Sequence, residues 1–201
     1  MKAAFAGVFL LLSVSQAMAF LPQFYETAEV TPGEGSLLAS VAPEIYGYGF
    51  FDWYTGTGAQ LELSGRYAFN EEYQLAIFGY AGGLIGLNGP GIILTENPDI
   101  GILPTGGIGF QGEFMEKPSL AGQLSIEFPS LISLTLLAGI NSRKSGREVV
   151  TIGLKSLAYY PSMAFINVHP TPNLHLSLGA SMILGLGGEV HAGVGYTILN
   201  K

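Results

Sequence analysis

The chain has 201 residues, no cysteine and a formal net charge of −7 at pH 7. The missing cysteine excludes a small disulfide-stapled domain, a thiol nucleophile and a thiolate metal site, and the acidic charge argues against nucleic acid as a partner. Charged residues make up only 11% of the chain, against about 25% in typical soluble domains, and the mean hydropathy is +0.40. The apolar residues must therefore be buried in a sizeable core or in a membrane.

The first 19 residues have the pattern of a secretory signal peptide. Lys2 precedes an apolar run that begins at Ala3, and the sequence AMA at residues 17–19 has the small residues of a cleavage site. The run is shorter than the roughly 20 residues that a membrane-spanning helix needs. We therefore predict a signal peptide over 1–19, a lead-in segment over 20–35 and one domain over 36–201.

Apolar and polar residues alternate with period two along most of the remaining chain. Leu61 and Leu63, for example, alternate with Gln60 and Glu62. Glycine and proline recur every few residues, and no segment keeps a helical period for long. The alternation predicts ten two-faced strands, over residues 37–50, 58–68, 72–81, 84–94, 100–113, 119–128, 131–140, 149–168, 173–184 and 187–199.

Two of these segments disagree with a regular strand. Residues 84–94 contain the sequence NGPG, which is equally typical of a loop because proline lacks a ladder donor. If 82–104 is one long loop, the number of strands falls to eight. In 149–168 the alternation slips near Ser156 and Pro161 follows, so we expect a bulge or an extended loop there.

Short breaks between the strands predict tight turns, which join antiparallel neighbours. With ten strands, the breaks at 69–71, 95–99, 129–130 and 169–172 all fall at one end, the expected periplasmic side. The longer polar connector 141–148 then falls at the other end. It carries three basic residues that we expect to meet anionic lipopolysaccharide groups at the outer surface or simply to be solvated: Arg143, Lys144 and Arg147.

The polar faces of the strands distinguish a lipid-facing barrel from a soluble β-sandwich. A sandwich turns its polar faces to water and fills them with Lys, Glu and Arg, whereas these faces carry Ser, Thr, Gln and Gly with few charges. In the clean strands the charges share the polar phase, as expected where a charge on the lipid face is costly. The candidate lumen-facing polar residues are Glu62, Arg66, Gln123, Glu127, His175, Glu189 and His191.

Aromatic residues gather near the predicted strand ends, as in the interfacial girdles of membrane barrels. They are Phe50, Phe51, Trp53, Tyr54, Tyr67, Phe69, Phe114, Tyr159 and Tyr160.

The signal peptide, the strands of about ten residues, short turns such as YAFNEEYQL and the C-terminal strand together resemble the bacterial outer-membrane β-barrel proteins. The resemblance covers about residues 36–199. It implies a closed, antiparallel, up-and-down transmembrane barrel in the outer membrane of a Gram-negative-type bacterium. It also implies contact with outer-membrane lipid and lipopolysaccharide, and insertion by the barrel-assembly machinery.

Candidate chemistry is confined to a few polar residues of the expected lumen. His175 and His191 fall in the lumen phase of neighbouring strands with Glu189 close by, so they could bind a metal or act as a base, and Ser177 and Ser181 share that face. Polar residues must face a lumen in any case, so we predict no catalysis, no metal and no cofactor. His169 is expected to be solvated at a turn.

A barrel of eight to ten strands has an interior filled by side chains, where Arg66 and Glu62, four residues apart on one strand face, could form a charge pair. The predicted function is therefore structural, adhesive or that of a narrow channel, not that of a wide general porin. Two alternatives remain open, a barrel-embedded lipid-modifying enzyme or protease and a soluble secreted β-sandwich that binds a ligand or partner.

Overall fold

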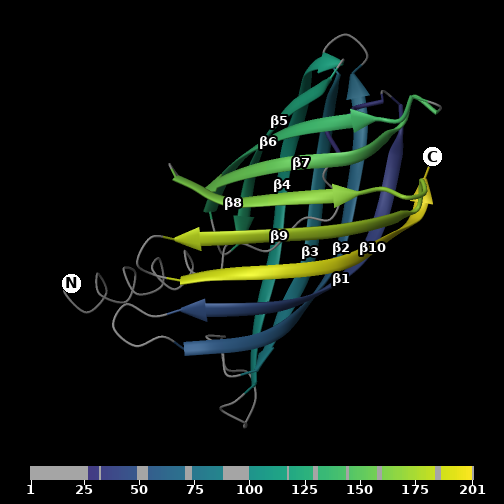
Figure 1. The fold of residues 1–201 in the computed structure, drawn as a ribbon. Helices are drawn as coiled ribbons and strands as arrows, with labels where there is room; N and C mark the ends of the chain where they lie inside the picture. Colours follow the sequence, from purple (N-terminus) through teal and green to yellow (C-terminus); the bar gives the residue numbers. More distant parts are fainter. Residues whose placement is uncertain are drawn as a thin grey trace.

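The computed structural model describes residues 27–31, 33–48, 54–70, 74–87, 100–116, 118–128, 131–143, 145–157, 160–183 and 187–200. Within these residues the regular structure is ten strands (Figure 1). They are β1 (Gly35–Tyr48), β2 (Tyr54–Asn70), β3 (Leu75–Leu87), β4 (Ile100–Glu116), β5 (Ser119–Phe128), β6 (Leu131–Asn141), β7 (Glu148–Leu157), β8 (Tyr160–Val168), β9 (Leu174–Ile183) and β10 (Gly187–Asn200). No helix in the described part of the chain is long and apolar enough to span a membrane.

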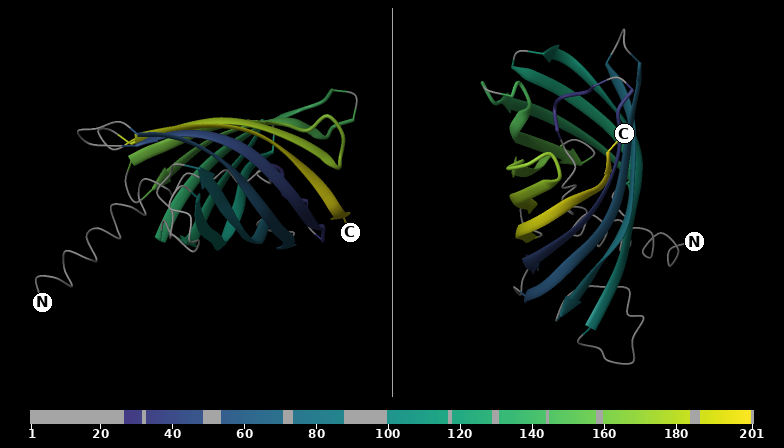
Figure 2. Two further views of the ribbon diagram at one scale, coloured as in Figure 1. Left: turned by 90° about the horizontal axis from the view of Figure 1, so that it is seen from below. Right: turned by 90° about the vertical axis from the view of Figure 1, so that its right-hand side faces the viewer.

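The strands form one closed antiparallel barrel. Each strand pairs with the next along the chain, and β1 closes the ring by pairing with β10 from Ser36↔Asn200 to Tyr48↔Gly187. Figure 2 shows the sheet curving round on itself in two further views. Because the ring has no edge strands, its backbone hydrogen bonds are made between neighbouring strands. The predicted fold class, an all-β closed barrel of ten strands, is confirmed.

The barrel is apolar outside and polar inside. In β5, Gln123, Ser125 and Glu127 are buried, whereas Leu124 and Ile126 are 57% and 70% exposed on the outer surface. The same alternation holds along the regular parts of the other strands, because successive side chains of a strand point to opposite faces. This is the inverse of a soluble barrel, whose apolar residues point inward.

Inward-facing glycines make room for large side chains that fill the interior. A Cβ added to Gly153 would lie 1.9 Å from the Phe165 ring, and one added to Gly179 would lie 2.2 Å from the His191 ring. Phe165 and His191 are themselves buried. The interior at these positions is therefore packed side chain against backbone, as expected for a small barrel.

Two predicted strand boundaries are wrong, although the total of ten is right. The predicted strands 72–81 and 84–94 are parts of one strand, β3, and the predicted strand 149–168 is two strands, β7 and β8. The register of β7 with β8 is irregular where Ser156 faces Pro161. The NGPG sequence at 88–91 lies outside the described residues.

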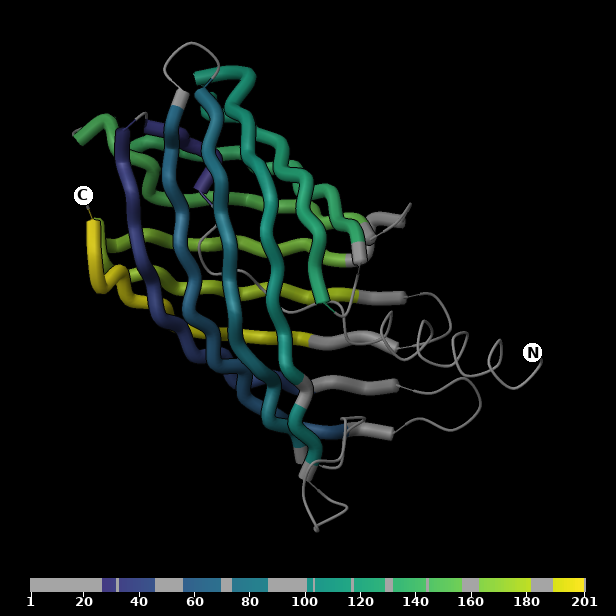
Figure 3. The backbone as a smooth tube through the Cα atoms, turned by 180° about the vertical axis from the view of Figure 1, so that it is seen from behind, coloured from purple at the N-terminus to yellow at the C-terminus, as the bar shows by residue number. Residues whose placement is uncertain are grey.

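The two rims of the barrel follow from the strand order. One, here called the terminal rim, carries the start of β1, the end of β10 and the connections 71–74, 117–118, 142–147 and 169–173 (Figure 3). Connection 129–130 lies at the opposite rim, as does 88–99. The prediction that all tight turns share one side with 129–130 is therefore wrong. The cause is the extra strand predicted between 72 and 94, which reversed the predicted direction of strands β4 to β7.

Candidate functional site

A charged pair lies inside the barrel between β5 and β7. The Lys155 Nζ is 2.8 Å from a Glu127 carboxylate oxygen, and these side chains are only 3% and 2% exposed. Ser125 and Ser133 each donate a hydroxyl hydrogen bond of 2.6 Å to Glu127. A buried charge needs both a partner and further hydrogen bonds, and Glu127 has both.

The polar interior continues on β1 and β2. The Gln60 side-chain amide donates a 3.1 Å hydrogen bond to Glu62, and both side chains are buried. Glu44 on β1 is buried as well, and neither of its carboxyl oxygens has a hydrogen-bond partner in the described structure. Gln123 is also inside, where it donates to Gln111 at 3.1 Å. The structure thus places Glu62, Gln123 and Glu127 in the lumen.

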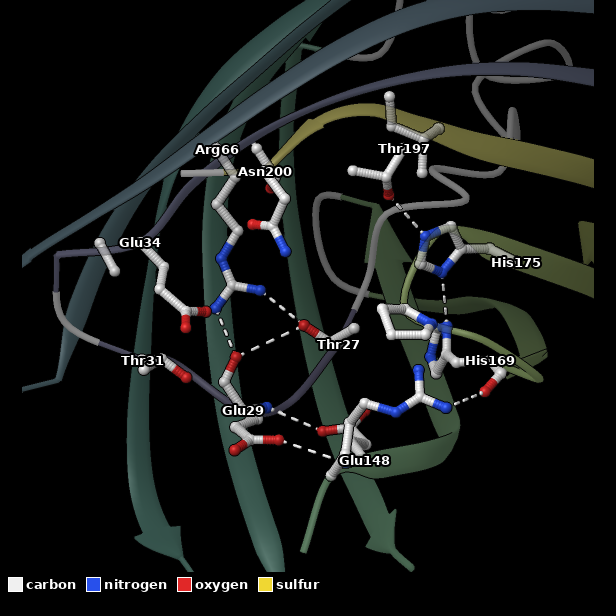
Figure 4. A pocket seen from close by; sticks show the side chains of 15 residues that line it. Thr27, Glu29, Thr31, Glu34, Arg66, Glu148, His169, His175, Thr197 and Asn200 are labelled. Carbon is white, nitrogen blue, oxygen red and sulfur yellow. Dashed lines mark hydrogen bonds between the residues drawn. The ribbon is translucent and has the colours of Figure 1, made fainter. Parts of the chain in front are cut away.

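The end of the lumen at the terminal rim holds residues 27–31, here called the strap, which precede β1 (Figure 4). Glu148 accepts hydrogen bonds from the Ala28 N–H at 3.1 Å and from the Glu29 N–H at 2.8 Å. Glu113 accepts one from the Val30 N–H at 2.8 Å. Because β4 supplies Glu113 and β7 supplies Glu148, the strap joins separate parts of the barrel wall.

Donors from β2 and β4 satisfy the carbonyl groups of the strap. The Arg66 guanidinium donates to the Glu29 carbonyl and to the Thr27 hydroxyl, both at 2.6 Å. The Gln111 amide donates to the Thr27 carbonyl at 2.7 Å and to the Ala28 carbonyl at 3.2 Å. Strands β2 and β7 are five neighbours apart in either direction around the ring, so the strap crosses the lumen from one wall to the other.

Two small side chains of the strap are packed into the wall. Ala28 is fully buried, and it belongs to an apolar cluster with Ala121, Leu137, Met163 and Phe165.

Val30 is 2% exposed and contributes to a second cluster with Ala68 and Ala76. The strap is therefore fixed by apolar contacts as well as by hydrogen bonds.

The predicted charge pair of Arg66 with Glu62 is replaced by other contacts. Arg66 binds the strap, and Glu62 accepts from Gln60. The prediction considered only the strand face that the two residues share, and residues 27–31 carry no periodic signal that places them inside a barrel. The functional residues that sequence reasoning missed here are Gln111, Glu113, Glu148 and the strap itself.

A row of histidines and threonines lines the lumen beside the strap. His169 Nε2 is 2.9 Å from the Thr151 hydroxyl, His169 Nδ1 is 2.8 Å from His175 Nδ1, and His175 Nε2 is 2.7 Å from the Thr197 hydroxyl. His169 is 2% exposed, so the expectation that it is solvated is wrong. Burial, with the neighbouring His175 and Arg147, lowers the pKa of His169 to about 3.

The candidate site of His175, His191 and Glu189 is not assembled. On the β9–β10 ladder His175 lies opposite Gly195, whereas His191 lies opposite Gly179, four residues further along β9. The side chain of Glu189 is outside the described residues.

Ser177 and Ser181 are buried, and their hydroxyls have no hydrogen-bond partner among the described atoms. Within the same part of the chain, no group of three or more His, Asp or Glu residues is placed to hold a metal ion.

The basic connector lies at the terminal rim beside the turn that holds His169. Arg147 donates to the His169 carbonyl at 2.9 Å, and Arg143 is exposed. Lys144 is outside the described residues. The sequence predicts that the connector and the 169–173 turn lie on opposite sides of the membrane. This prediction is wrong, because the two segments are in contact.

A pocket of about 180 Å³ opens between the strap and the wall at this rim (Figure 4). Its lining includes Glu29 of the strap, Glu34, and Arg66, His175 and Thr197 from the wall. Both acidic and basic side chains border this pocket.

The aromatic residues near the terminal rim face outward. Tyr67, Phe69 and Phe114 are each at least half exposed on the outer surface. The other aromatic residues of the predicted girdles, or their side chains, lie outside the described part: Phe50, Phe51, Trp53, Tyr54, Tyr159 and Tyr160.

Together these features define the class, a closed ten-stranded antiparallel barrel with an apolar exterior and a packed polar interior. Solved structures similar to it include two of the attachment invasion locus protein Ail of Yersinia pestis, one in complex with the heparin analogue sucrose octasulfate. They are 21% and 20% identical to this chain and match 84% of it and 100% of Ail, each with a TM-score of 0.36.

Neisserial surface protein A (NspA) is 13% identical, with 83% of this chain and 99% of NspA covered and a TM-score of 0.38. No protein-family model matches the chain, and no curated protein sequence does. At TM-scores this low, nothing known of Ail or NspA is carried over to this chain.

Proposed function

We propose that the protein is an outer-membrane β-barrel of a Gram-negative-type bacterium with a structural or adhesive role. The observation that carries the proposal is the outward row of apolar residues on strand after strand. Leu134, Leu136 and Ile152, for example, are each about half exposed on the outer surface. Such a surface is stable against lipid, and in water it would be an apolar patch far larger than soluble proteins show.

The side chains and the strap inside the barrel favour a lumen that is blocked over one that is an open pore. The Lys155–Glu127 pair, the rings of Phe165 and His191 and the strap all lie within it. An aqueous channel requires polar side chains that water can reach, and these are buried. A narrow-channel role and a catalytic role are therefore not part of the proposal.

The terminal rim is proposed to face the periplasm. The longest connection between strands, residues 88–99, belongs to the opposite rim, and in such barrels the longer loops are extracellular. Arg143 and Arg147 then lie on the periplasmic side, so lipopolysaccharide contact falls to other residues. Lipid is the partner of the outer surface, and the barrel-assembly machinery is the expected partner for insertion.

Fractionation of cell envelopes, combined with a conductance measurement, tests the proposal. The protein should sediment with outer membranes, resist extraction by carbonate and enter solution only with detergent. Reconstituted into planar bilayers, it should produce no stable channels. Release into the soluble periplasmic fraction would contradict the membrane location, and regular single-channel steps would contradict the closed lumen.

A further inference from the structure

The wall of the lumen holds the strap mainly through the backbone. Glu148 accepts the successive N–H groups of Ala28 and Glu29, and Glu113 accepts the N–H of the next residue, Val30, while Arg66 and Gln111 donate to carbonyls. These four wall residues are here called the cradle. Every peptide presents the same N–H and C=O groups, so the cradle recognises a main-chain path, which bends at Ala28, with little demand on sequence.

Other residues of the barrel wall hydrogen-bond to the side chains of the cradle. Glu113 also accepts a hydrogen bond from the Ser119 hydroxyl, and Glu148 accepts one from the Thr151 hydroxyl. Gln123 donates to the Gln111 side-chain carbonyl at 3.1 Å. These bonds come from strands β5 and β7, so the barrel wall itself orients three of the four cradle side chains.

Sequence selectivity in the strap comes from two sockets. The fully buried Ala28 fits a socket that admits only a small side chain, and Val30 fits a larger apolar one. Between them Glu29 is partly exposed, and Thr31 is exposed. The pattern required of an occupant is therefore a small residue, any residue, then a medium aliphatic residue.

We propose that the cradle is a peptide-binding site, which accepts short segments of the pattern small-x-aliphatic in the bent conformation of the strap and is occupied by residues 27–31 of its own chain. The peptide is held mainly by its main chain, and two of its side chains enter sockets in different parts of the wall. In other peptide sites a neighbouring strand makes the hydrogen bonds to the peptide main chain, whereas here side chains of the wall make them. The pocket of about 180 Å³ beside the strap gives a second segment room to approach.

The test vacates the cradle in the full-length protein without altering it. The variant A28P/V30P removes two of the three N–H donors that Glu148 and Glu113 receive, those of Ala28 and Val30, because proline has no N–H. A fluorescein-labelled peptide of residues 27–33, TAEVTPG, is then titrated into the variant in detergent, and anisotropy is recorded. We expect saturable binding to A28P/V30P, and binding at least tenfold weaker to the wild type, whose cradle is filled.

Matched controls assign the binding to the cradle. The variant A28P/V30P/E148A should bind the peptide at least tenfold more weakly than A28P/V30P, and so should a peptide carrying the two prolines. Cross-linking A28C to A121C in the otherwise cysteine-free chain should leave peptide binding as weak as in the wild type under oxidising conditions.

If A28P/V30P does not give a heat-modifiable barrel, V30D vacates the same cradle by placing a charge in the apolar socket. No saturable binding to a folded, vacated variant would overturn the proposal, and so would binding that ignores Glu148→Ala. Neither result bears on the membrane location, which fractionation tests separately.

Discussion

Lys155 and Glu127 lie 2.8 Å apart in an interior that leaves each side chain at most 3% exposed. Removing one partner of such a pair leaves an uncompensated buried charge, which costs about 3–5 kcal/mol. We expect Lys155→Met to lower the free energy of unfolding by about that amount, measured by urea titration in lipid vesicles. The double variant K155M/E127L should recover most of the loss. A single variant as stable as the wild type would show that Glu127 does not depend on Lys155.

His169 should make stability depend on pH. Its folded pKa of about 3 lies below its ordinary value of 6.5, so the unfolded chain binds more protons between these values, and stability falls as the pH drops from about 6.5 toward 3. The charged or titratable groups near it are His175, Arg147 and, through Thr151, Glu148.

We expect His169→Gln to flatten this part of the profile, since Gln stays neutral while it keeps a hydrogen-bonding side chain. The measurement is the thermal midpoint of both proteins in detergent at pH 7, 6, 5 and 4. Parallel profiles for the two proteins would contradict the assignment.

Among the elements, β7 depends on a glycine that faces inward. A methyl group at Gly153 would lie 1.9 Å from the Phe165 ring, so Gly153→Ala should destabilise the barrel by about 1–3 kcal/mol through overpacking. The matched control is Gly122→Ala on β5, where the nearest atom is 4.0 Å away and the glycine faces outward. Urea unfolding of the two variants should separate them, and equal stabilities would argue against the packed interior.

Strand β6 allows a depth-dependent test of lipid contact. Leu136 lies near the middle of β6 and Ile140 near its end at the terminal rim, and both are exposed outward. Arginine on a lipid face costs about 2–4 kcal/mol at the midplane and about 0–1 kcal/mol near the interface. We therefore expect Leu136→Arg to lower the free energy of unfolding in vesicles more than Ile140→Arg does. Two equally mild changes would indicate a water-facing surface.

Strand faces were more predictable than strand ends. The alternation around Glu62 and Glu127 places both inside, because period two needs no knowledge of the partner strand. The boundaries at 81–84 and near Ser156 needed long-range pairing, since β3 continues through residues 82–84 against β2 and β4. One false break therefore reversed the rim assignment of 129–130 and of the basic connector.

For the whole molecule, composition and charge phase were enough to predict the fold class, whereas the strap was not predictable. The partners of residues 28–30 lie 83 to 120 positions away in the chain, and no local pattern encodes such contacts. No local pattern distinguishes Glu113 and Glu148 in the sequence for the same reason. Only the closed ring brings β4, β7 and the segment before β1 together.

The central claim is that this chain forms a closed barrel with lipid outside and polar groups inside. The most direct test is heat-modifiable migration of the protein after detergent extraction from membranes. Unboiled, the closed barrel should run as a compact species, and after boiling it should shift to the position expected for its unfolded mass. A single position with and without boiling, or protein found without detergent in the soluble fraction, would contradict the account.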